Sequence, residues 1–294
     1  MRDLLVRTSR TFALSIPLLP EPTQTALAVA YLLFRVADTL EDAAHWPRDE
    51  RVIALDELVP VLRDGDAARA RTASRDWVGR NVTTEKGCHD LLIAFPSLLD
   101  ELSTWAPARA RIVREHAART AEGMAETLRT ADAEGHVRLG SLPALRAYCY
   151  VVAGIVGELV TALFLHDAPS LVAVKETLVV HERAFGEGLQ LVNILKDERA
   201  DAQDGRVYLP PGVPREEVLA LARADLKEAR AYVAALAAGG APPGFVAFTT
   251  LPVELAERAL TAVEKRGTGA KVPRDEVLAL VARVKERVRN AVRG

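Results

Sequence analysis

The chain has 294 residues, of which 49% are hydrophobic, so it holds ample material for one large core. Its 38 Lys and Arg residues nearly balance its 40 Asp and Glu residues, and the formal net charge is -2. This balance argues against general nucleic-acid binding, which needs a net basic footprint. Charged residues of mixed sign make up 27% of the chain, which argues against disorder.

Proline and glycine residues separate long stretches of helical periodicity along the chain. We predict helices over residues 23–44, 49–62, 89–105, 108–130, 144–166, 170–201, 215–238, 245–266 and 274–292. The stretch 64–87 is poorly periodic and is expected to hold a helix with loops, and residues 131–143 are expected to form a loop. Because no stretch alternates strictly and no repeat or long linker divides the chain, we predict an all-α fold and a single domain over residues 1–294.

Three features of the sequence indicate the compartment. Cys88 and Cys149 are too few for a disulfide scaffold and form no CxxC pair, so we expect two small apolar side chains in a reducing cytosol. Glu158 interrupts the most apolar stretch, 148–165, whereas a membrane span needs about 20 nearly uncharged residues. Polar and proline residues also interrupt the first apolar stretch, which disfavours a signal peptide. We therefore predict a cytoplasmic protein without a membrane span.

A first column of polar residues lies within the helix predicted over residues 23–44. Asp38 and Asp42 are four residues apart, so their carboxylates lie on one helix face. Arg35 lies one turn before Asp38, and Tyr31 lies one turn before Arg35. The flanking residues are apolar, and burying an acid pair in such a stretch is costly unless a partner compensates its charge.

A second column has the same design and lies 159 residues further along the chain, measured from Asp38 to Asp197. Gln190, Asn193, Asp197 and Asp201 follow one another at spacings of 3, 4 and 4 in an otherwise aliphatic stretch. A lone acidic pair is weak evidence, because composition alone gives roughly five such pairs, most of them on solvated helix faces. Two such columns, each with amide or guanidinium partners, favour a functional interpretation.

Paired carboxylates on apolar helices suit Mg²⁺, which prefers oxygen ligands and combines one or two carboxylates with substrate phosphates and water. Two carboxylate walls across a cavity could hold a Mg²⁺–diphosphate cluster and assist departure of the diphosphate. Glycoside hydrolysis is the competing use of a carboxylate pair. An aromatic content of only 5% makes a sugar site less attractive.

Several short motifs occur in one order along the chain. They are Ser9-Arg10-Thr11-Phe12, Asp38-Thr39-Leu40-Glu41-Asp42, Gly123-Met124-Ala125, Tyr148-Cys149, the V-A-G-x-V-G segment 152–157, the second column 190–201, and the segment 205–210. In order and approximate spacing they resemble the squalene/phytoene synthases, the head-to-head prenyl synthases. The resemblance is vague in the C-terminal part of the chain.

The resemblance implies an isoprenoid-synthase fold with helices around a central apolar cavity. It also implies an enzyme, a prenyltransferase that condenses two farnesyl diphosphates in a Mg²⁺-dependent reaction through presqualene diphosphate to squalene, with reduction by NADPH. A phytoene or dehydrosqualene synthase, which omits the net reduction, is the alternative. A terpene cyclase and a non-catalytic helical relative that acts as a partner or assembly factor are two further alternatives.

The resemblance also assigns roles to individual residues. Those implied to bind Mg²⁺ are Asp38, Glu41, Asp42, Asn193, Asp197 and Asp201. Those implied to bind diphosphate or the phosphates of NADPH are Ser9, Arg10, Arg35 and Arg206. The last of these lies in the segment 205–210, which the resemblance implies to be a flap. Those implied to line the pocket are Phe12, Tyr31, Gln190 and Tyr208. Tyr148 is the implied acid/base or cation-steadying residue, and together with Arg35 and the four aspartates it forms the expected catalytic set.

Some of these residues also have structural interpretations or depart from the family pattern. Ser9 could simply cap a helix. Gly154 and Gly157 could admit a prenyl chain or only permit close helix packing. Lys196 stands where the family usually has Arg, which keeps the charge for substrate binding but loses bidentate phosphate geometry. Val151 stands where many relatives carry a further Tyr, so a candidate catalytic hydroxyl is missing.

The expected partners follow from the same resemblance. We expect prenyl diphosphates as substrates, and we expect no binding of nucleic acid. Because the implied product is apolar, we expect that the cytoplasmic protein can contact a membrane peripherally to release it. The expected oligomeric state is a monomer or a weak dimer.

Overall fold

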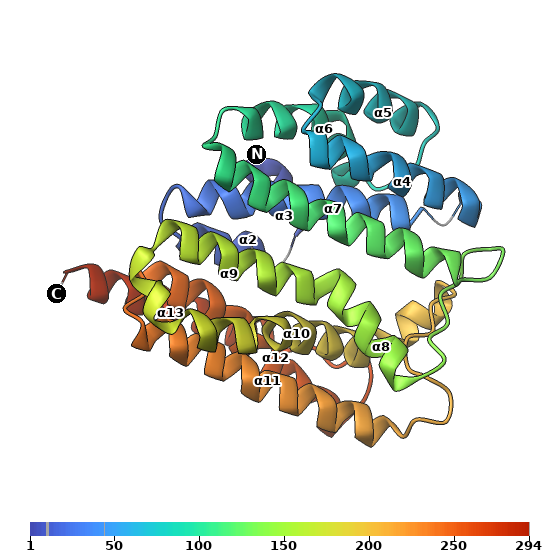
Figure 1. Cartoon of the computed structure of the whole chain (residues 1–294). Helices are drawn as coiled ribbons and strands as arrows, with labels where there is room; N and C mark the ends of the chain where they lie inside the picture. The colour runs from blue at the N-terminus through green and yellow to red at the C-terminus, as the bar shows by residue number, and fades with distance from the viewer. Residues whose placement is uncertain (10–11, 44, 294) are drawn as a thin grey trace. The chain divides into compact units, whose positions relative to one another are not determined.

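The computed structural model describes all residues except 10–11, 44 and 294. Among the described residues there is no strand, and one isolated bridge joins Arg138 and Val207. The elements are α1 (Arg2–Thr8), α2 (Phe12–Ser15), η1 (Ile16–Leu18), α3 (Thr23–Glu41), α4 (Arg48–Asp64), α5 (Ala67–Gly79), α6 (Lys86–Ser103), α7 (Pro107–Arg129), α8 (Leu142–Cys149), η2 (Tyr150–Gly154), α9 (Ile155–Asp167), η3 (Pro169–Val174), α10 (Lys175–Gln203), α11 (Arg215–Ala238), α12 (Pro243–Arg266) and α13 (Arg274–Arg293) (Figure 1). The all-α prediction is confirmed.

The chain forms two compact units, of which the first comprises residues 1–13 and 25–137. In this unit α4 packs along α7, α5 packs along α6, and α1 contacts α6. Trp77 and Phe95 are fully buried, and their rings stack at a centroid distance of 5.8 Å. Burial of such large side chains gives this unit a core of its own.

The second unit comprises residues 14–24 and 138–294. Its long helix α10 packs against α9, α11 and α12. Phe164 stacks on Phe245 with ring centroids 3.9 Å apart, and Phe185 stacks on Tyr232 at 5.1 Å. All four rings are buried, so the residues that carry the second acidic column lie on a helix that is surrounded by core contacts.

The helix predicted over residues 144–166 is interrupted in the structure. Five residues, Tyr150–Gly154, form the π-helical turn η2 between α8 and α9. A Cβ at Gly186 would collide with the carbonyl oxygen of Ala153, and a Cβ at Gly157 would collide with that of Glu182. Glycine at these two positions therefore lets η2 and α9 approach the backbone of α10, which supports the packing interpretation of Gly157.

Smaller differences from the sequence prediction occur at helix ends and at the N-terminus. The helix predicted over 170–201 begins as the 3₁₀ turn η3 before α10 continues to Gln203. Helices α1 and α2 were not predicted, because seven and four residues are too short for a periodic pattern. The helices α11, α12 and α13 agree with the prediction to within two residues at each end.

One helical run of the described residues, Leu142–Asp167, is long and apolar enough by length and composition to cross a membrane. The sequence did not predict such a run, because the charge of Glu158 interrupts the apolar stretch. In the structure the Glu158 carboxylate accepts hydrogen bonds from Arg183 at 2.7 Å and from Tyr150 at 3.2 Å. Of the most apolar window of this run, 56% is buried inside the molecule, as in a core helix.

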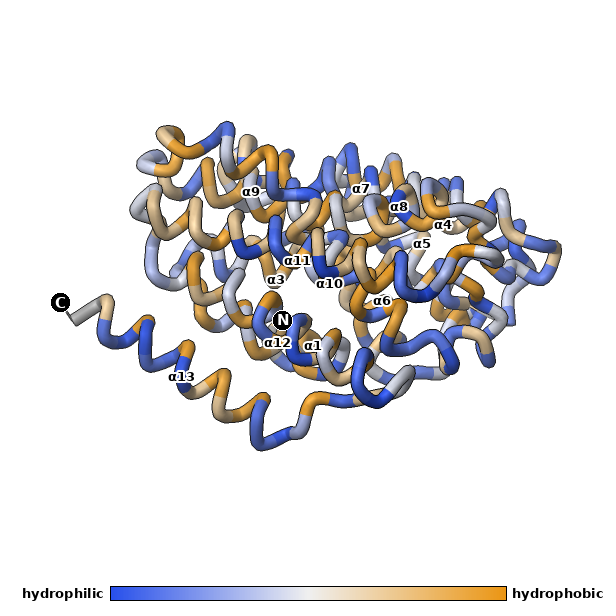
Figure 2. The backbone as a smooth tube through the Cα atoms, turned by 90° about the horizontal axis from the view of Figure 1, so that it is seen from below, coloured by the Kyte–Doolittle hydropathy of each residue, from blue (hydrophilic) through white to orange (hydrophobic). Residues whose placement is uncertain are grey.

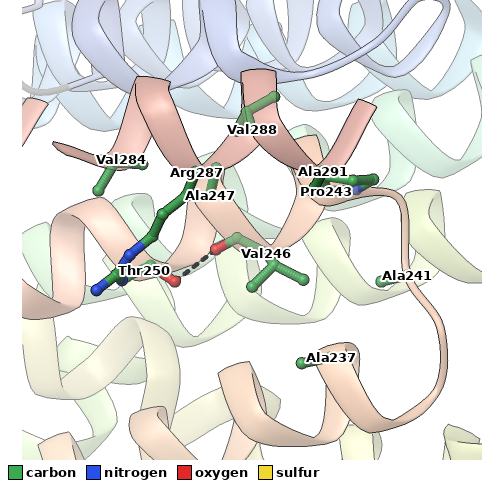
Figure 3. Close-up of a pocket in the computed structure, with 10 residues that line it drawn as sticks. All are labelled: Ala237, Ala241, Pro243, Val246, Ala247, Thr250, Val284, Arg287, Val288 and Ala291. Atoms are coloured by element: carbon green, nitrogen blue, oxygen red, sulfur yellow. Dashed lines mark hydrogen bonds between the residues drawn. The ribbon is translucent and has the colours of Figure 1, made fainter. Parts of the chain in front are cut away.

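The last helix, α13, alternates between hydrophilic and hydrophobic residues along its length (Figure 2). Its residues Leu280, Val281 and Val284 are buried against Ala247 and Leu251 of α12. Toward the end of α13 a groove of about 300 Å³ opens between α12 and α13 (Figure 3). The groove is lined mainly by alanine, valine and proline residues, with Arg287 as its charged side chain.

Candidate active site

The first acidic column is present on α3, in the first unit. A guanidinium nitrogen of Arg35 lies 3.5 Å from a carboxylate oxygen of Asp38. The Arg35 side chain also lies 3.6 Å from the Glu85 carboxylate and donates to the sulfur of Cys88 at 3.6 Å. The i,i+3 pairing that the sequence predicted is therefore extended by two residues from the start of α6.

The N-terminal motif joins this column on α3. The Tyr31 hydroxyl donates to the carbonyl oxygen of Thr8 at 2.6 Å, and the Phe12 and Tyr31 rings lie 5.4 Å apart. The Ser9 hydroxyl accepts a hydrogen bond from the backbone N–H of Phe12 at 3.0 Å, which is a capping contact. Arg10, the other predicted residue of this motif, lies outside the described residues.

The electrostatics of this column are unusual for a helix surface. Desolvation by the surrounding protein raises the pKa of Asp38 to about 6, although the charge of Arg35 acts in the opposite direction. Burial alone would lower the pKa of Arg35, but Asp38 and neighbouring groups raise it, so the guanidinium stays charged. Glu41 is half-buried and Asp42 is exposed at the end of the helix. The column therefore offers carboxylate oxygens in a partly dehydrated environment that favours a cation.

Glu85 and Cys88 were not predicted as site residues. They are 47 or more residues away from Asp38, so no helical spacing connects them to the first column. The Cys88 thiol donates to the Glu85 carboxylate at 3.4 Å and is buried. Burial raises the pKa of Cys88, which keeps it a thiol and makes it a poor nucleophile. Both cysteines are free, as their apolar interpretation expected.

The second acidic column is present on α10, in the second unit. The Lys196 ammonium lies 3.2 Å from the Asn193 side-chain oxygen and 3.1 Å from the Asp197 carboxylate. Lys196 therefore contacts two of the predicted metal ligands. Gln190, which lies about one helical turn before Asn193 on α10, is half-buried.

The flap after α10 returns toward the end of this column. Gly205 has a φ of +79°, and the backbone N–H of Arg206 donates to the carbonyl oxygen of Asp201 at 2.8 Å. The Arg206 guanidinium lies 3.9 Å from the Asp201 carboxylate and 3.0 Å from that of Asp204. A predicted phosphate-binding arginine and a predicted metal ligand thus lie together.

Tyr148 and Tyr208, which the sequence proposed for separate roles, form a pair. The Tyr148 hydroxyl donates to the Tyr208 hydroxyl at 3.0 Å, and the rings stack at 4.7 Å. Next to Tyr208, the Val207 carbonyl oxygen accepts a hydrogen bond from the Leu139 N–H at 3.0 Å. The flap is therefore attached both to the segment before α8 and to the last turn of α8.

A further group of metal-type ligands lies in the loop after α7. Atoms of Asp132, Glu134 and His136 lie within 4.8 Å of one another. The Asp132 carboxylate accepts from the His136 N–H at 2.8 Å and contacts its Nδ1 at 3.2 Å. These two contacts join Asp132 and His136 within one turn of the loop.

Two short acidic columns, each with a basic side chain beside its carboxylates, are typical of an enzyme that handles anionic phosphate groups. A family model described as squalene/phytoene synthase matches residues 5–213 of the chain. The chain belongs to this family. The match includes both columns, Tyr148 and the flap.

Curated relatives agree with this assignment. The chain is 28% identical to squalene synthase ERG9 of Candida albicans over 209 residues, which cover 71% of this chain and 44% of that protein. It is 30% identical to squalene synthase of Eremothecium gossypii over 215 residues, which cover 71% of this chain and 45% of that protein. The matched region thus spans less than half the length of these relatives.

Solved structures show the same fold. A complex of TcSQS with the ligand BPH1237 matches with a TM-score of 0.77 at 21% identity, over 97% of this chain and 85% of that one. A dehydrosqualene synthase in complex with a ligand matches with a TM-score of 0.57 at 20% identity, over 98% and 95%. Squalene synthase HpnC from Alicyclobacillus acidocaldarius matches with a TM-score of 0.59 at 20% identity, over 90% of this chain and 92% of that one. The isoprenoid-synthase fold expected from the sequence is confirmed.

Proposed function

We propose that this protein is a Mg²⁺-dependent prenyltransferase that joins two molecules of farnesyl diphosphate head to head. The product of the proposed reaction is squalene, formed through presqualene diphosphate and a reduction by NADPH. The observation that carries the proposal is the family match over residues 5–213, which includes both acidic columns. The curated relatives at 28% and 30% identity, which are named squalene synthases, favour this product.

The donor atoms of both columns fit magnesium. Each column offers oxygen ligands, and in each a basic side chain already contacts an aspartate, at 3.5 Å for Arg35 and Asp38 and at 3.1 Å for Lys196 and Asp197. Such carboxylates gain from a nearby cation. The residues that would hold Mg²⁺ are Asp38, Glu41 and Asp42 on α3 and Asn193, Asp197 and Asp201 on α10. When bound, the ion would neutralise diphosphate oxygens and assist their departure as a Lewis acid.

The remaining proposed roles belong to this chain's own side chains. Arg35 would bind diphosphate oxygens with its guanidinium, which the Glu85 and Asp38 carboxylates orient. Ser9 and Arg10 would add contacts to diphosphate or to the phosphates of NADPH, and Lys196 and Arg206 would do so beside the second column. The pocket residues would be Phe12, Tyr31, Gln190 and Tyr208.

Tyr148 would hold or transfer a proton at its hydroxyl oxygen. The Tyr208 hydroxyl accepts the Tyr148 hydrogen bond, which fixes the direction of that proton in the absence of substrate. Tyr148 is buried, so bulk water competes weakly for this hydroxyl. These features support a role for Tyr148 in proton handling near the departing diphosphate.

A synthase that omits the reduction is the second candidate. The chain matches a dehydrosqualene synthase structure over 98% of its length. Dehydrosqualene from farnesyl diphosphate, or phytoene from geranylgeranyl diphosphate, would use the same first condensation and the same metal ligands.

Product analysis separates these candidates. The purified protein is incubated with farnesyl or geranylgeranyl diphosphate and Mg²⁺, with and without NADPH, and products are extracted for mass spectrometry. Squalene formed only with NADPH is the expected result. Dehydrosqualene or phytoene formed without NADPH would transfer the function to the second candidate. No condensation of either substrate would contradict the proposed transferase activity.

The proposal extends to the state of the protein in the cell. Residues 1–294 would act as a single catalytic domain, as a monomer or weak dimer in the cytoplasm with peripheral membrane contact. The structural match to TcSQS over 97% of the chain supports one domain, because it includes residues of both units. Vesicle flotation and light scattering of the purified chain test the membrane contact and the oligomeric state.

A further inference from the structure

A buried cluster of ions ties α8 to two other helices of the second unit. Arg146 on α8 pairs with Glu187 on α10 at 3.1 Å and with Asp225 on α11. The side chains of Glu187 and Asp225 are only 6% and 8% exposed, whereas Arg146 is half-buried. One guanidinium therefore bridges two buried carboxylates from different helices.

Stability alone explains this cluster poorly. Burial raises the pKa of both Glu187 and Asp225, and the charge of Arg146 opposes that shift in each case. Arg146 is the side chain that pairs with both carboxylates, although the charge of Arg183 also acts on Glu187. Buried ion pairs of this kind often add little net stability over apolar residues. A buried ion cluster can instead specify geometry, and the position of Arg146 shows what this one would specify.

Arg146 lies two residues before Tyr148 on the same short helix. At 3.6 residues per turn, two residues correspond to a rotation of about 200°, so the two side chains leave α8 on nearly opposite sides. Arg146 contacts α10 and α11, while Tyr148 contacts Tyr208 of the flap. Fixing the rotation of α8 at Arg146 therefore fixes the direction in which the Tyr148 hydroxyl points.

The helix cannot obtain this fixation from its own length. α8 has eight residues and passes directly into the π turn η2, whose wider ring departs from regular α-helical pairing. Glu187 also lies close to η2, because a Cβ built at Gly154 would lie 3.1 Å from its carboxylate oxygen. The same carboxylate thus lies against the π turn and pairs with the arginine that precedes it.

The geometry points to Arg146, Glu187 and Asp225 as positioning residues that set the orientation of Tyr148 toward Tyr208. This inference rests on the proposed function only in giving Tyr148 a catalytic role. The orientation itself can be measured without any substrate.

The first test uses the five tyrosines of the chain as probes. The full chain is labelled with 3-fluorotyrosine, and each ¹⁹F resonance is assigned with a Tyr→Phe variant. Asp225→Asn should shift the resonances of Tyr148 and Tyr208 and leave that of Tyr31, which lies in the other unit, unchanged. Arg146→Lys should do the same, because a lysine cannot bridge two carboxylates with a rigid fork.

Glu264→Gln is the matched control. Glu264 on α12 pairs at 2.6 Å with Arg223, which like Asp225 lies on α11, so the variant also removes an ion pair of α11. It should leave the Tyr148 and Tyr208 resonances in place. If Asp225→Asn and Arg146→Lys both fold, as judged by circular dichroism, and neither moves these resonances, the inference is wrong.

The second test is kinetic and uses the active enzyme. Asp225→Asn should lower kcat about tenfold with KM for farnesyl diphosphate changed less than about twofold, because the substrate contacts remain. In a Tyr148→Phe background the same change should have an effect below about twofold on kcat, since residues that act through one another are not additive. Full additivity would overturn the inference. An inactive wild type would contradict the proposed function and leave the fluorine measurement to decide the inference alone.

Discussion

At the scale of single residues, Asp38 has the most informative environment. It combines a neighbouring guanidinium at 3.5 Å with a pKa raised by desolvation to about 6. Desolvation and ion pairing act in opposite directions on a carboxylate, and here desolvation prevails. A carboxylate in this situation is suited to a divalent cation that arrives with substrate.

We predict that Asp38→Asn lowers the rate of diphosphate release by two or more orders of magnitude, about 3 kcal/mol or more in activation free energy. Helix content by circular dichroism should not change, because the amide keeps the shape of the side chain. Asp100→Asn is the control, since Asp100 forms an exposed ion pair with Arg71 at 3.2 Å. A wild-type rate for Asp38→Asn would remove it from the metal site.

Tyr148→Phe should slow turnover about 100-fold, because the ring stays in place and only the proton-carrying hydroxyl is lost. The melting temperature should change little, since the lost hydrogen bond joins two tyrosine hydroxyls at 3.0 Å. Tyr150→Phe is the comparison, because its hydroxyl bonds Glu158 instead. Equal rates for wild type and Tyr148→Phe would return Tyr148 to a packing role.

Helical spacing in the sequence predicted the contacts between site residues that lie on the same helix. Arg35 and Asp38 are one turn apart, and Asn193 and Asp197 are likewise one turn apart, so local spacing alone brings them together. Glu85 and Cys88 approach Arg35 only through the packing of the start of α6, and no spacing in the sequence encodes that contact. The Tyr148–Tyr208 pair joins a helix to a flap 60 residues away and was equally inaccessible.

At the scale of elements, helix existence followed from periodicity and from proline and glycine punctuation. The boundaries of α11 and α12 were predicted to within two residues, because glycine and proline residues bound them. The π turn η2 was not predicted, because the apolar pattern continues through it and its wider turn depends on contacts with α10. The ion cluster of Arg146, Glu187 and Asp225 was not predicted either, because it depends on contacts between helices that are far apart in the sequence.

We predict that Gly186→Ala destabilises the protein by about 3 kcal/mol, because the new Cβ would collide with a backbone carbonyl oxygen that cannot move alone. Gly79→Ala should instead be neutral or stabilising by about 0.5 kcal/mol, since a Cβ there meets nothing within 4 Å and Gly79 ends a helix. Urea unfolding of both variants measures the difference. Equal stabilities would show that η2 and α10 separate at little cost.

At the scale of the whole molecule, stability should depend on pH through the buried carboxylates. The pKa of Asp225 is raised by burial in the folded state, so the folded protein binds that proton more tightly than the unfolded chain. Its contribution to stability is therefore largest below the ordinary carboxyl pKa and is lost as pH rises through the raised value. The Asp225→Asn variant has no carboxyl group at this position and therefore lacks this pH-dependent contribution.

Urea unfolding of wild type and Asp225→Asn at a series of pH values from about 4 to 8 measures this contribution. The free energy of unfolding of wild type, relative to the variant, should fall as pH increases. A relative stability that increases with pH over this range would show that Arg146 lowers the pKa of Asp225 overall, against the direction derived from its burial.

We propose above all that the two acidic columns carry metal-dependent diphosphate chemistry. The most direct measurement is release of inorganic diphosphate from farnesyl diphosphate by the wild type and by Asp38→Asn and Asp201→Asn, with Mg²⁺, with EDTA, and with Mg²⁺ restored in excess. We expect rapid release by the wild type with Mg²⁺, none with EDTA, full recovery when Mg²⁺ is restored, and strongly reduced release by both variants. Release that persists in EDTA, or that is unchanged in both variants, would contradict this proposal.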